Sequence, residues 1–205
     1  MPIHLPELLS PAGNFEKLEA ALRYGADAVY LAGKRFGMRA ASENFSADEL
    51  RDAVRLAHGM GKKIYLTLNI LPREDMYPDI EDYLDEISDI PVDAFIVADI
   101  GVMGLLMRVR PGAVIHVSTQ ASAVSSYDCE MYRSLGASRV VLARELSLSE
   151  IGRIREKTDI ELEVFVHGSM CVSYSGLCLL SDNLCGRDAN LGECAQPCRW
   201  KWKLV

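Results

Sequence analysis

The strongest constraint on the fold is a pattern that recurs three times along the 205-residue chain. Each copy begins with a Gly or Pro that breaks a helix, continues through small or polar residues and ends in an apolar run, at 25–32, 91–98 and 136–143. Near-continuous apolar strands separated by helices are typical of a parallel sheet with both faces covered. The repeat therefore predicts an α/β fold built from successive strand–helix units.

Applying this pattern to the whole chain predicts seven strands. Most of them are followed by a segment whose apolar residues recur at intervals of three and four, as on one face of a helix. Helix starts are marked by Asn14, a capping residue, and by two capping boxes, Ser46 with Glu49 and Ser147 with Glu150. The expected strands are 5–9, 28–31, 63–68, 94–98, 114–117, 139–143 and 162–166.

Seven such units in one chain favour a TIM-barrel-like (β/α)8 fold over a doubly wound sheet. No GxGxxG motif follows the first strand, which weakens the dinucleotide-binding alternative. A barrel of this kind typically has eight strands and about 250 residues. We therefore expect an incomplete barrel with two open sheet edges, either truncated or completed by an oligomer or a partner chain. The expected division is barrel units at 1–168, then a cysteine-rich loop and the start of a truncated C-terminal part at 169–205.

Composition narrows the functional classes. No apolar run is long enough to span a membrane, and the start lacks the basic and long apolar regions of a secretory signal, so we expect a cytoplasmic protein. In that compartment clustered cysteines more often serve metal or redox chemistry than disulfides. The net charge of −7 argues against coating nucleic acid by bulk electrostatics. A local basic patch at 199–203 is compatible with that charge.

Five of the six cysteines follow the seventh strand, and three interpretations of them are open. An iron–sulfur site suits the irregular loop, with Cys171, Cys178 and Cys194 as ligands and Cys198 or Cys185 as further candidates. A zinc ribbon is poorly supported because the spacing lacks a paired CxxC. The second interpretation is a nucleophile, Cys171 four residues after His167, and the third is inert packing of one or two thiols. Cys129, alone in a helix, is expected to be structural.

Polar residues gather where the expected strands end. In a (β/α)8 barrel the active site lies at the carboxyl ends of the strands, although strand ends are also simply where polarity begins. No HExxH or GxSxG motif points to a zinc protease or serine hydrolase. We expect Arg144, Glu145 and His167 to be catalytic. Substrate binding is expected from the remaining strand-end residues Arg39, Asn44, Asn69 and Gln120.

The region after the seventh strand resembles the signature of peptidase family U32, the collagenase-like group. Four other parts of the chain also resemble the family: 7–13, Asn44 with Phe45, 144–147 and 186–200. Within the family, the chain resembles the bacterial tRNA-hydroxylating branch. The residues that carry the resemblance are Glu163-x-Phe165-x-x-Gly168-Ser169-Met170-Cys171-x4-Gly176-x-Cys178-x-Leu180-Ser181.

The resemblance implies a barrel-like N-terminal domain and oxygen-independent hydroxylation of tRNA, of ribosomal RNA or of a quinone precursor. In the tRNA branch it implies 5-hydroxyuridine at the wobble position, with prephenate as the hydroxyl source. It also implies a 4Fe–4S cluster, three of whose ligands match Cys171, Cys178 and Cys194. The family's fourth ligand would lie beyond Val205, so we expect Cys198 or Cys185 to substitute, or the cluster to be incomplete.

Three functions are therefore weighed. The first is an RNA-modifying enzyme that hydroxylates tRNA with an iron–sulfur cluster, with tRNA as its partner. The second is a collagenase-like peptidase centred on Cys171 or a metal, and the third is a non-catalytic metal-binding fragment or subunit. Residues 199–203, RWKWK, either contact RNA through stacking and phosphate contacts or bury their tryptophans.

Overall fold

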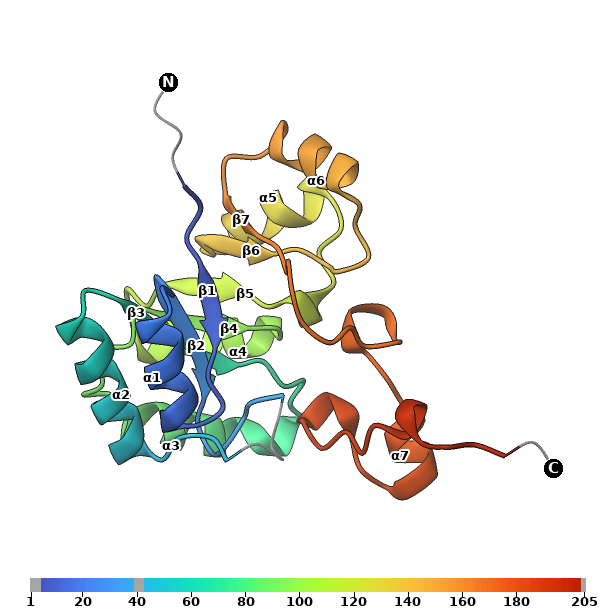
Figure 1. Cartoon of the computed structure of the whole chain (residues 1–205), viewed down its shortest axis with the longest axis horizontal. Helices are drawn as coiled ribbons and strands as arrows, with labels where there is room; N and C mark the ends of the chain where they lie inside the picture. Colours follow the sequence, from blue (N-terminus) through green and yellow to red (C-terminus); the bar gives the residue numbers. More distant parts are fainter. Residues whose placement is uncertain (1–4, 39–42, 204–205) are drawn as a thin grey trace.

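The computed structural model describes residues 5–38 and 43–203. Its centre is one parallel sheet in which every strand pairs with the next one along the chain, in the order β1 to β7. The sheet curls as in a TIM barrel, with helices between its strands (Figure 1), and this confirms the predicted architecture. The strands are β1 (Leu9–Pro11), β2 (Ala28–Ala32), β3 (Lys63–Leu68), β4 (Ala94–Val97), β5 (Ile115–Val117), β6 (Arg139–Val141) and β7 (Glu161–Glu163).

Six helices connect these strands, and their starts are set by local side-chain chemistry. The side chain of Asn14 accepts a hydrogen bond from the backbone N–H of Lys17. Both predicted capping boxes form, at Ser46 and at Ser147. The helices are α1 (Phe15–Arg23), α2 (Ala47–Gly59), α3 (Tyr77–Glu86), α4 (Ile100–Val109), α5 (Ser126–Ser134) and α6 (Leu148–Arg155).

Side chains of alternating strand residues enter two different clusters. In β3, Ile64, Leu66 and Leu68 belong to the large core between sheet and helices. Tyr65 belongs to a smaller cluster, together with Ala28 and Ala94 of the neighbouring strands. This alternation is the two-residue period of a strand, and it puts most of the apolar burial outside the barrel. The smaller cluster also contains Ile96, with Leu9 and Tyr30 packed against it, so the interior combines a few apolar side chains with polar ones.

The first and last strands differ from their expected positions. Leu5 and Leu8 are 77% and 49% exposed, and pairing begins only at Leu9, opposite Ala28. At the other edge, pairing of β7 with β6 ends at Glu163, and residues 164–166 are exposed. Both edge strands were predicted to extend further than they do, because a strand needs a hydrogen-bonded neighbour as well as an apolar pattern. Closure of this open sheet by another chain stays a prediction.

Residues 169–203, here called the cysteine-rich segment, fold into short turns of helix. In Figure 1 this segment follows β7 and includes α7, and part of it lies beside the loop that precedes α3. Its elements are η3 (Tyr174–Gly176), α7 (Leu180–Cys185), η4 (Ala189–Leu191) and η5 (Pro197–Arg199). Within the described part of the chain, no helix is both long and apolar enough to cross a membrane.

Candidate functional site at the carboxyl ends of the strands

Glu145, in the loop after β6, holds the beginning of the cysteine-rich segment. Its Oε1 accepts a hydrogen bond from the backbone N–H of Ser175 at 2.6 Å, and its Oε2 accepts one from the Ser175 hydroxyl at 3.1 Å. Burial alone would raise the pKa of Glu145, but the bonds from Ser175 and the nearby charge of Arg144 hold it below its ordinary value. Glu145 is therefore an anionic acceptor in this contact.

Gln120 and Arg144 pack beneath the next residue, Gly176. A Cβ atom on Gly176 would lie 2.9 Å from Gln120 Nε2 and 3.4 Å from Arg144 Nη2, so any other residue there would have to displace the ends of these side chains. Among the described residues, Gln120 Oε1 and Arg144 Nε are buried without a hydrogen-bond partner. Buried polar atoms without partners are costly, and they mark places where a polar ligand or water is expected.

The far half of the cysteine-rich segment contacts the loops after β2 and β3. The backbone N–H of Leu71 donates to the carbonyl of Asn190 at 3.0 Å, and Arg73 forms a 3.0 Å ion pair with Asp188. Gly192 packs so tightly that a Cβ there would overlap the carbonyl oxygen of Gly37. The segment therefore spans the loops that follow β2, β3, β5 and β6, all at the carboxyl ends of the strands.

Asn69 and Gln120, both predicted to bind substrate, are linked through one hydroxyl. Asn69 Nδ2 donates to Ser118 Oγ at 3.4 Å, and the backbone N–H of Gln120 donates to the same oxygen at 3.3 Å. Asn44 is buried, and its backbone N–H donates to the carbonyl of Gly13 near the end of β1. Arg39 lies outside the described residues.

His167 is exposed, and in the described part of the chain no hydrogen bond joins it to a cysteine thiol, to Arg144 or to Glu145. The structure therefore does not bring it together with Arg144 and Glu145 in one hydrogen-bonded group. Those two residues do share one place, because Glu145 contacts Ser175 and Arg144 contacts the adjacent Gly176.

The predicted metal ligands lie in one segment but do not converge. Residues 5–38 and 43–203 contain no group of three or more His, Cys, Asp or Glu side chains that could hold a metal ion. Four thiols of the segment are exposed and Cys178 is half-buried; the exposed ones are Cys171, Cys185, Cys194 and Cys198.

Two of these thiols nevertheless accept hydrogen bonds from backbone N–H groups. Cys178 Sγ accepts a 3.3 Å hydrogen bond from the backbone N–H of Leu180, and Cys194 Sγ accepts one from Gln196 at 3.3 Å. A hydrogen bond with Ser173 is the main reason why the pKa of Cys178 lies below its ordinary value, with the Leu180 N–H as a second cause. The donor chemistry suits a soft metal, whereas the described arrangement does not assemble its site.

Sequence reasoning missed a charged cluster at the opposite end of the strands. The carboxylate of Glu7, just before β1, accepts hydrogen bonds from Lys63 Nζ at 2.7 Å, Tyr65 Oη at 2.7 Å and Arg139 Nη1 at 2.8 Å. Arg139 also contacts Glu163 at 3.3 Å. We call these five residues the amino-end cluster. The available signal was the charge at the start of otherwise apolar strands, at Lys63 and Arg139.

The amino-end cluster is ionised at its centre. Burial would raise the pKa of Glu7, but hydrogen bonds from Lys63, Tyr65 and Arg139 lower it to about 2. Burial, and secondly the charge of Arg139, lowers the pKa of the neighbouring His116 to about 3, so its ring is neutral. The cluster thus fills the interior of the curled sheet with paired charges.

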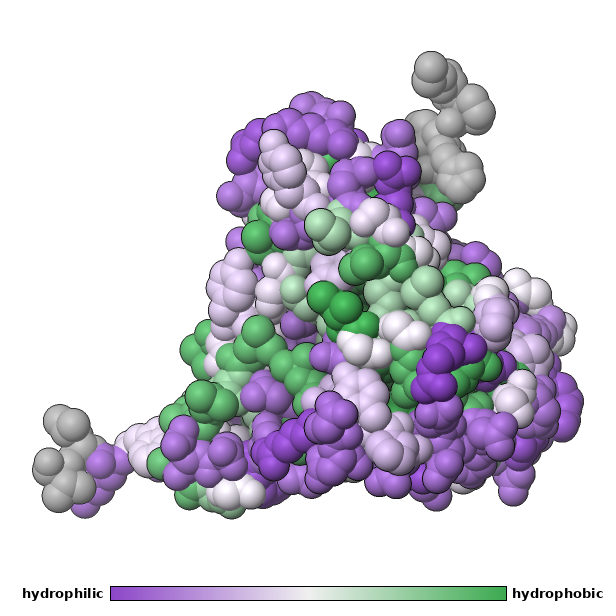
Figure 2. All heavy atoms as spheres, turned by 180° about the vertical axis from the view of Figure 1, so that it is seen from behind, coloured by the Kyte–Doolittle hydropathy of each residue, from purple (hydrophilic) through white to green (hydrophobic). Residues whose placement is uncertain are grey.

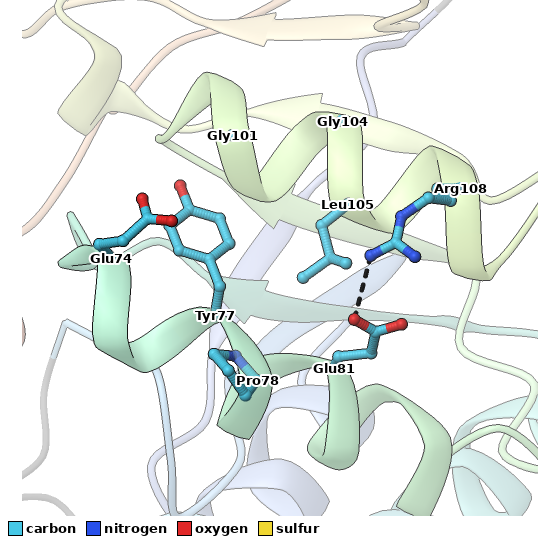
Figure 3. Close-up of a pocket in the computed structure, with 8 residues that line it drawn as sticks. All are labelled: Glu74, Tyr77, Pro78, Glu81, Gly101, Gly104, Leu105 and Arg108. Carbon is cyan, nitrogen blue, oxygen red and sulfur yellow. Dashed lines mark hydrogen bonds and ion pairs between the residues drawn. The ribbon is translucent and has the colours of Figure 1, made fainter.

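A surface hollow of about 450 Å³ lies between α3 and α4 (Figure 3). It exists because Gly101 and Gly104 present no side chain toward α3, and Tyr77 donates a 2.6 Å hydrogen bond to Asp99 beside it. Glu81 and Arg108 form a 3.0 Å ion pair across the hollow. None of the predicted site residues lines it.

Comparison with known proteins gives matches along nearly the whole chain. Residues 13–205 match peptidase family U32. A tRNA hydroxylation protein of Bacillus subtilis is 45% identical over 199 residues, which cover 97% of this chain and 47% of that protein. A 23S ribosomal RNA 5-hydroxycytidine synthase of Escherichia coli is 38% identical and covers 98% of this chain and 30% of that protein. A collagenase of Porphyromonas gingivalis is 32% identical and covers 94% and 49%.

The chain therefore spans about half the length of the tRNA hydroxylation protein and the collagenase that it matches. A solved structure of a U32 peptidase superposes with a TM-score of 0.65 over 78% of this chain and 68% of the other, at 20% identity. At that identity the likeness supports the curled βα fold alone.

Proposed function

The chain belongs to peptidase family U32, and from this premise we propose that it modifies RNA by hydroxylating the wobble uridine of tRNA. The relatives named for RNA hydroxylation include one that is 45% identical over 97% of this chain. The activity of the longer relatives is carried over here as a proposal. As a tRNA-modifying protein it would work in the cytoplasm.

The observation that carries the proposal is the position of the cysteine-rich segment over Gln120 and Arg144. Both side chains hold a buried polar atom without a partner, and both lie under Gly176 at the end of the barrel where such folds do chemistry. We propose that a small anionic hydroxyl donor, prephenate, binds here, because a guanidinium pairs well with a carboxylate. Asn69, through Ser118, would hold the backbone of Gln120 in place.

The 4Fe–4S cluster also stays a proposal, on Cys171, Cys178, Cys194 and Cys198. Thiolates are the usual ligands of such clusters, and backbone N–H groups already point at two of these sulfurs. Because the thiols do not converge in the described structure, we assign no chemical step to a cluster. Iron and sulfide content after anaerobic reconstitution tests this part: Cys178→Ser should lower it, whereas Cys129→Ala, at a buried position of helix α5 away from the proposed ligands, should not.

Nucleoside mass spectrometry tests the function. The chain would be produced in a bacterium lacking its own tRNA hydroxylation proteins, both alone and in place of the matching half of the Bacillus subtilis relative. We expect 5-hydroxyuridine derivatives with the chimaera, loss of them in Cys178→Ser and Arg144→Gln, and retention in Cys129→Ala. A chimaera that is folded and abundant but forms no such derivative would overturn the proposal.

The name of the Porphyromonas gingivalis relative keeps a collagenase-like peptidase as the second candidate. The described residues give it no nucleophile–base pair, since His167 makes no hydrogen bond to Cys171. Gelatin cleavage by purified protein that disappears in Cys171→Ala would support the peptidase. Cleavage that persists in this variant would indicate a contaminant.

A further inference from the structure

The two tryptophans of the chain, Trp200 and Trp202, form an exposed stacked pair. Their ring centroids are 6.0 Å apart and their planes differ by 28°. The side chains are 46% and 65% exposed, which is unusual for residues of this size. We call this pair the tryptophan shelf. The alternative of burial, left open by the sequence, does not hold.

Hydrogen bonds fix the orientation of both indoles. Trp200 Nε1 donates to the carbonyl of Ala195 at 3.2 Å, and Trp202 Nε1 donates to the carbonyl of Pro197 at 3.0 Å. The polar edge of each ring is thereby satisfied within the protein. The parts of the indole faces that do not stack on each other are left toward solvent. A flat partner would therefore meet a surface that is already ordered.

The same loop carries two of the proposed cluster ligands. Ala195 follows Cys194, and Pro197 precedes Cys198. The Cys194 thiol accepts the backbone N–H of Gln196, between the two carbonyls that hold the indoles. A molecule stacked on the shelf would therefore lie next to the thiols that the proposed function uses.

The charge around the shelf is positive although the chain is acidic overall. Residues 199–203 contain three cations, Arg199, Lys201 and Lys203, and no acidic residue, against a net charge of −7 for the whole chain. All three cations are exposed, and in the described part of the chain none of them forms an ion pair. In Figure 2 the C-terminal region projects at lower left, with apolar (green) surface beside hydrophilic (purple) surface.

We propose that the tryptophan shelf binds single-stranded RNA, with a nucleobase on the open indole face and phosphates on the flanking cations. Aromatic faces interleaved with basic side chains are the usual means of holding single strands, because every base has a stacking face and every linkage a negative charge. A protein partner would be less well matched by three clustered cations without a carboxylate. This inference rests on the proposed function for its biological setting. The part of tRNA that the tryptophan shelf would bind is the unpaired anticodon strand.

Intrinsic fluorescence tests the shelf directly, since both tryptophans of the chain lie in it. The probe is a uridine-rich RNA octamer, either single-stranded or annealed to its complement. We expect saturable quenching of tryptophan emission by the single strand and weaker binding of the duplex. Absent quenching, or equal affinity for the two forms, would overturn the proposal.

Variants separate stacking from charge, with fluorescence anisotropy of a labelled octamer as the readout. Trp202→Ala should weaken binding by roughly five-fold to a hundred-fold, the range of one lost base stack. Trp202→Phe keeps a stacking face and should bind within a few-fold of the parent, as should Tyr127→Ala, an exposed aromatic on α5. If Trp202→Phe lost as much affinity for the octamer as Trp202→Ala, the proposed stacking of a base on the shelf would be overturned.

The salt dependence tests the phosphate contacts. Lys201→Gln combined with Lys203→Gln should lower the slope of log affinity against log salt by about 1.4, about 0.7 for each contact. Lys157→Gln, at an exposed site near the end of α6, should leave the slope unchanged. An unchanged slope in the double variant would overturn the charge part.

These measurements require no hydroxylation. If the chimaera forms no 5-hydroxyuridine while octamer binding depends on Trp202, the shelf stands and the proposed function fails. If hydroxylation proceeds and Trp202→Ala binds RNA as the parent does, the function stands and the shelf fails.

Discussion

The carboxylate of Glu145 accepts both the backbone N–H and the hydroxyl of Ser175, 30 residues further along the chain. Ser175 is fully buried and has a φ of 46°, in the left-handed region. Such a conformation in a residue other than glycine persists only where its surroundings enforce it. Glu145 supplies that enforcement, and so fixes where the cysteine-rich segment begins.

Removing this acceptor should release the start of the segment. We expect Glu145→Ala to destabilise the docked segment by about 1 to 2 kcal/mol, because the buried N–H of Ser175 loses its partner. Hydrogen exchange measured by mass spectrometry should become faster at 170–180 and stay unchanged in β2 and β3. Glu156→Ala, at the exposed end of α6, is the control. Equal protection in both variants would contradict the role given to Glu145.

Two glycines of the segment make a matched pair. Gly192 and Gly186 have φ values of 89° and 62°, so alanine is strained at either position. Around Gly186 there is open space, whereas a Cβ on Gly192 would overlap Gly37. Gly186→Ala should therefore cost only about 1 kcal/mol of local stability. Gly192→Ala should in addition detach the segment from the loop after β2, visible as faster limited proteolysis; identical proteolysis of the two variants would refute this contact.

Stability should fall in acid because of Glu7. Its folded pKa of about 2 lies below the ordinary 4.5, so its stabilisation is present above about pH 4.5 and is lost as the pH falls toward 2. After allowance for solvent screening the loss is about 2 kcal/mol. Burial raises the pKa of Glu163, which titrates in the opposite sense and does not cause this loss.

Denaturant titrations at several pH values measure this effect. Glu7→Gln should lower the free energy of unfolding at pH 7 and flatten its dependence between pH 4.5 and 2. Glu161→Gln serves as the control, because Glu161 contacts the same Arg139 but its side chain is 65% exposed. A parental pH dependence in Glu7→Gln would show that other carboxylates dominate.

Thiol reactivity should follow the surroundings of each cysteine. Cys178 should be alkylated by iodoacetamide at pH 7, while Cys129, whose pKa burial raises to about 11, should stay unmodified in the folded protein. Ser173→Ala removes the main cause of the lowered pKa of Cys178 and should slow its alkylation roughly two- to five-fold. Peptide mass spectrometry gives both rates, and Ser169→Ala is the control. A Cys178 rate unaffected by Ser173→Ala would contradict the assigned cause.

The parts of this fold that depend on local pattern could be predicted from sequence. The strand at Lys63–Leu68 was predicted with its observed bounds, and the caps at Ser46 and Ser147 form because each needs only residues three positions apart. The edge strands were misplaced because their length depends on a neighbour, which no local pattern reveals. Residues 164–166 look like a strand, but within the described residues pairing of β7 with β6 ends at Glu163.

For the candidate site, the position of its residues at strand ends could be predicted from the sequence, whereas their contacts could not. Gln120, Arg144 and Glu145 follow strand ends, so their common edge could be inferred from the parallel sheet. Their contacts with 175–176 could not, since nothing in the sequence says where an irregular loop returns. The ion pair of Arg73 with Asp188, 115 residues apart, could not be predicted for the same reason. The amino-end cluster was missed because the sequence does not show that charges at the starts of distant strands meet in the interior of the curled sheet.

The hydrogen bond between Glu7 and Arg139 has a mechanical consequence. It joins the residues before β1 to the start of β6, two strands that are not paired with each other in the described sheet. In a closed barrel, backbone hydrogen bonds fix the spacing of all the strands. Between β1 and β6 a side-chain contact contributes to that spacing, so its loss would remove a link between the two strands without breaking any backbone pair.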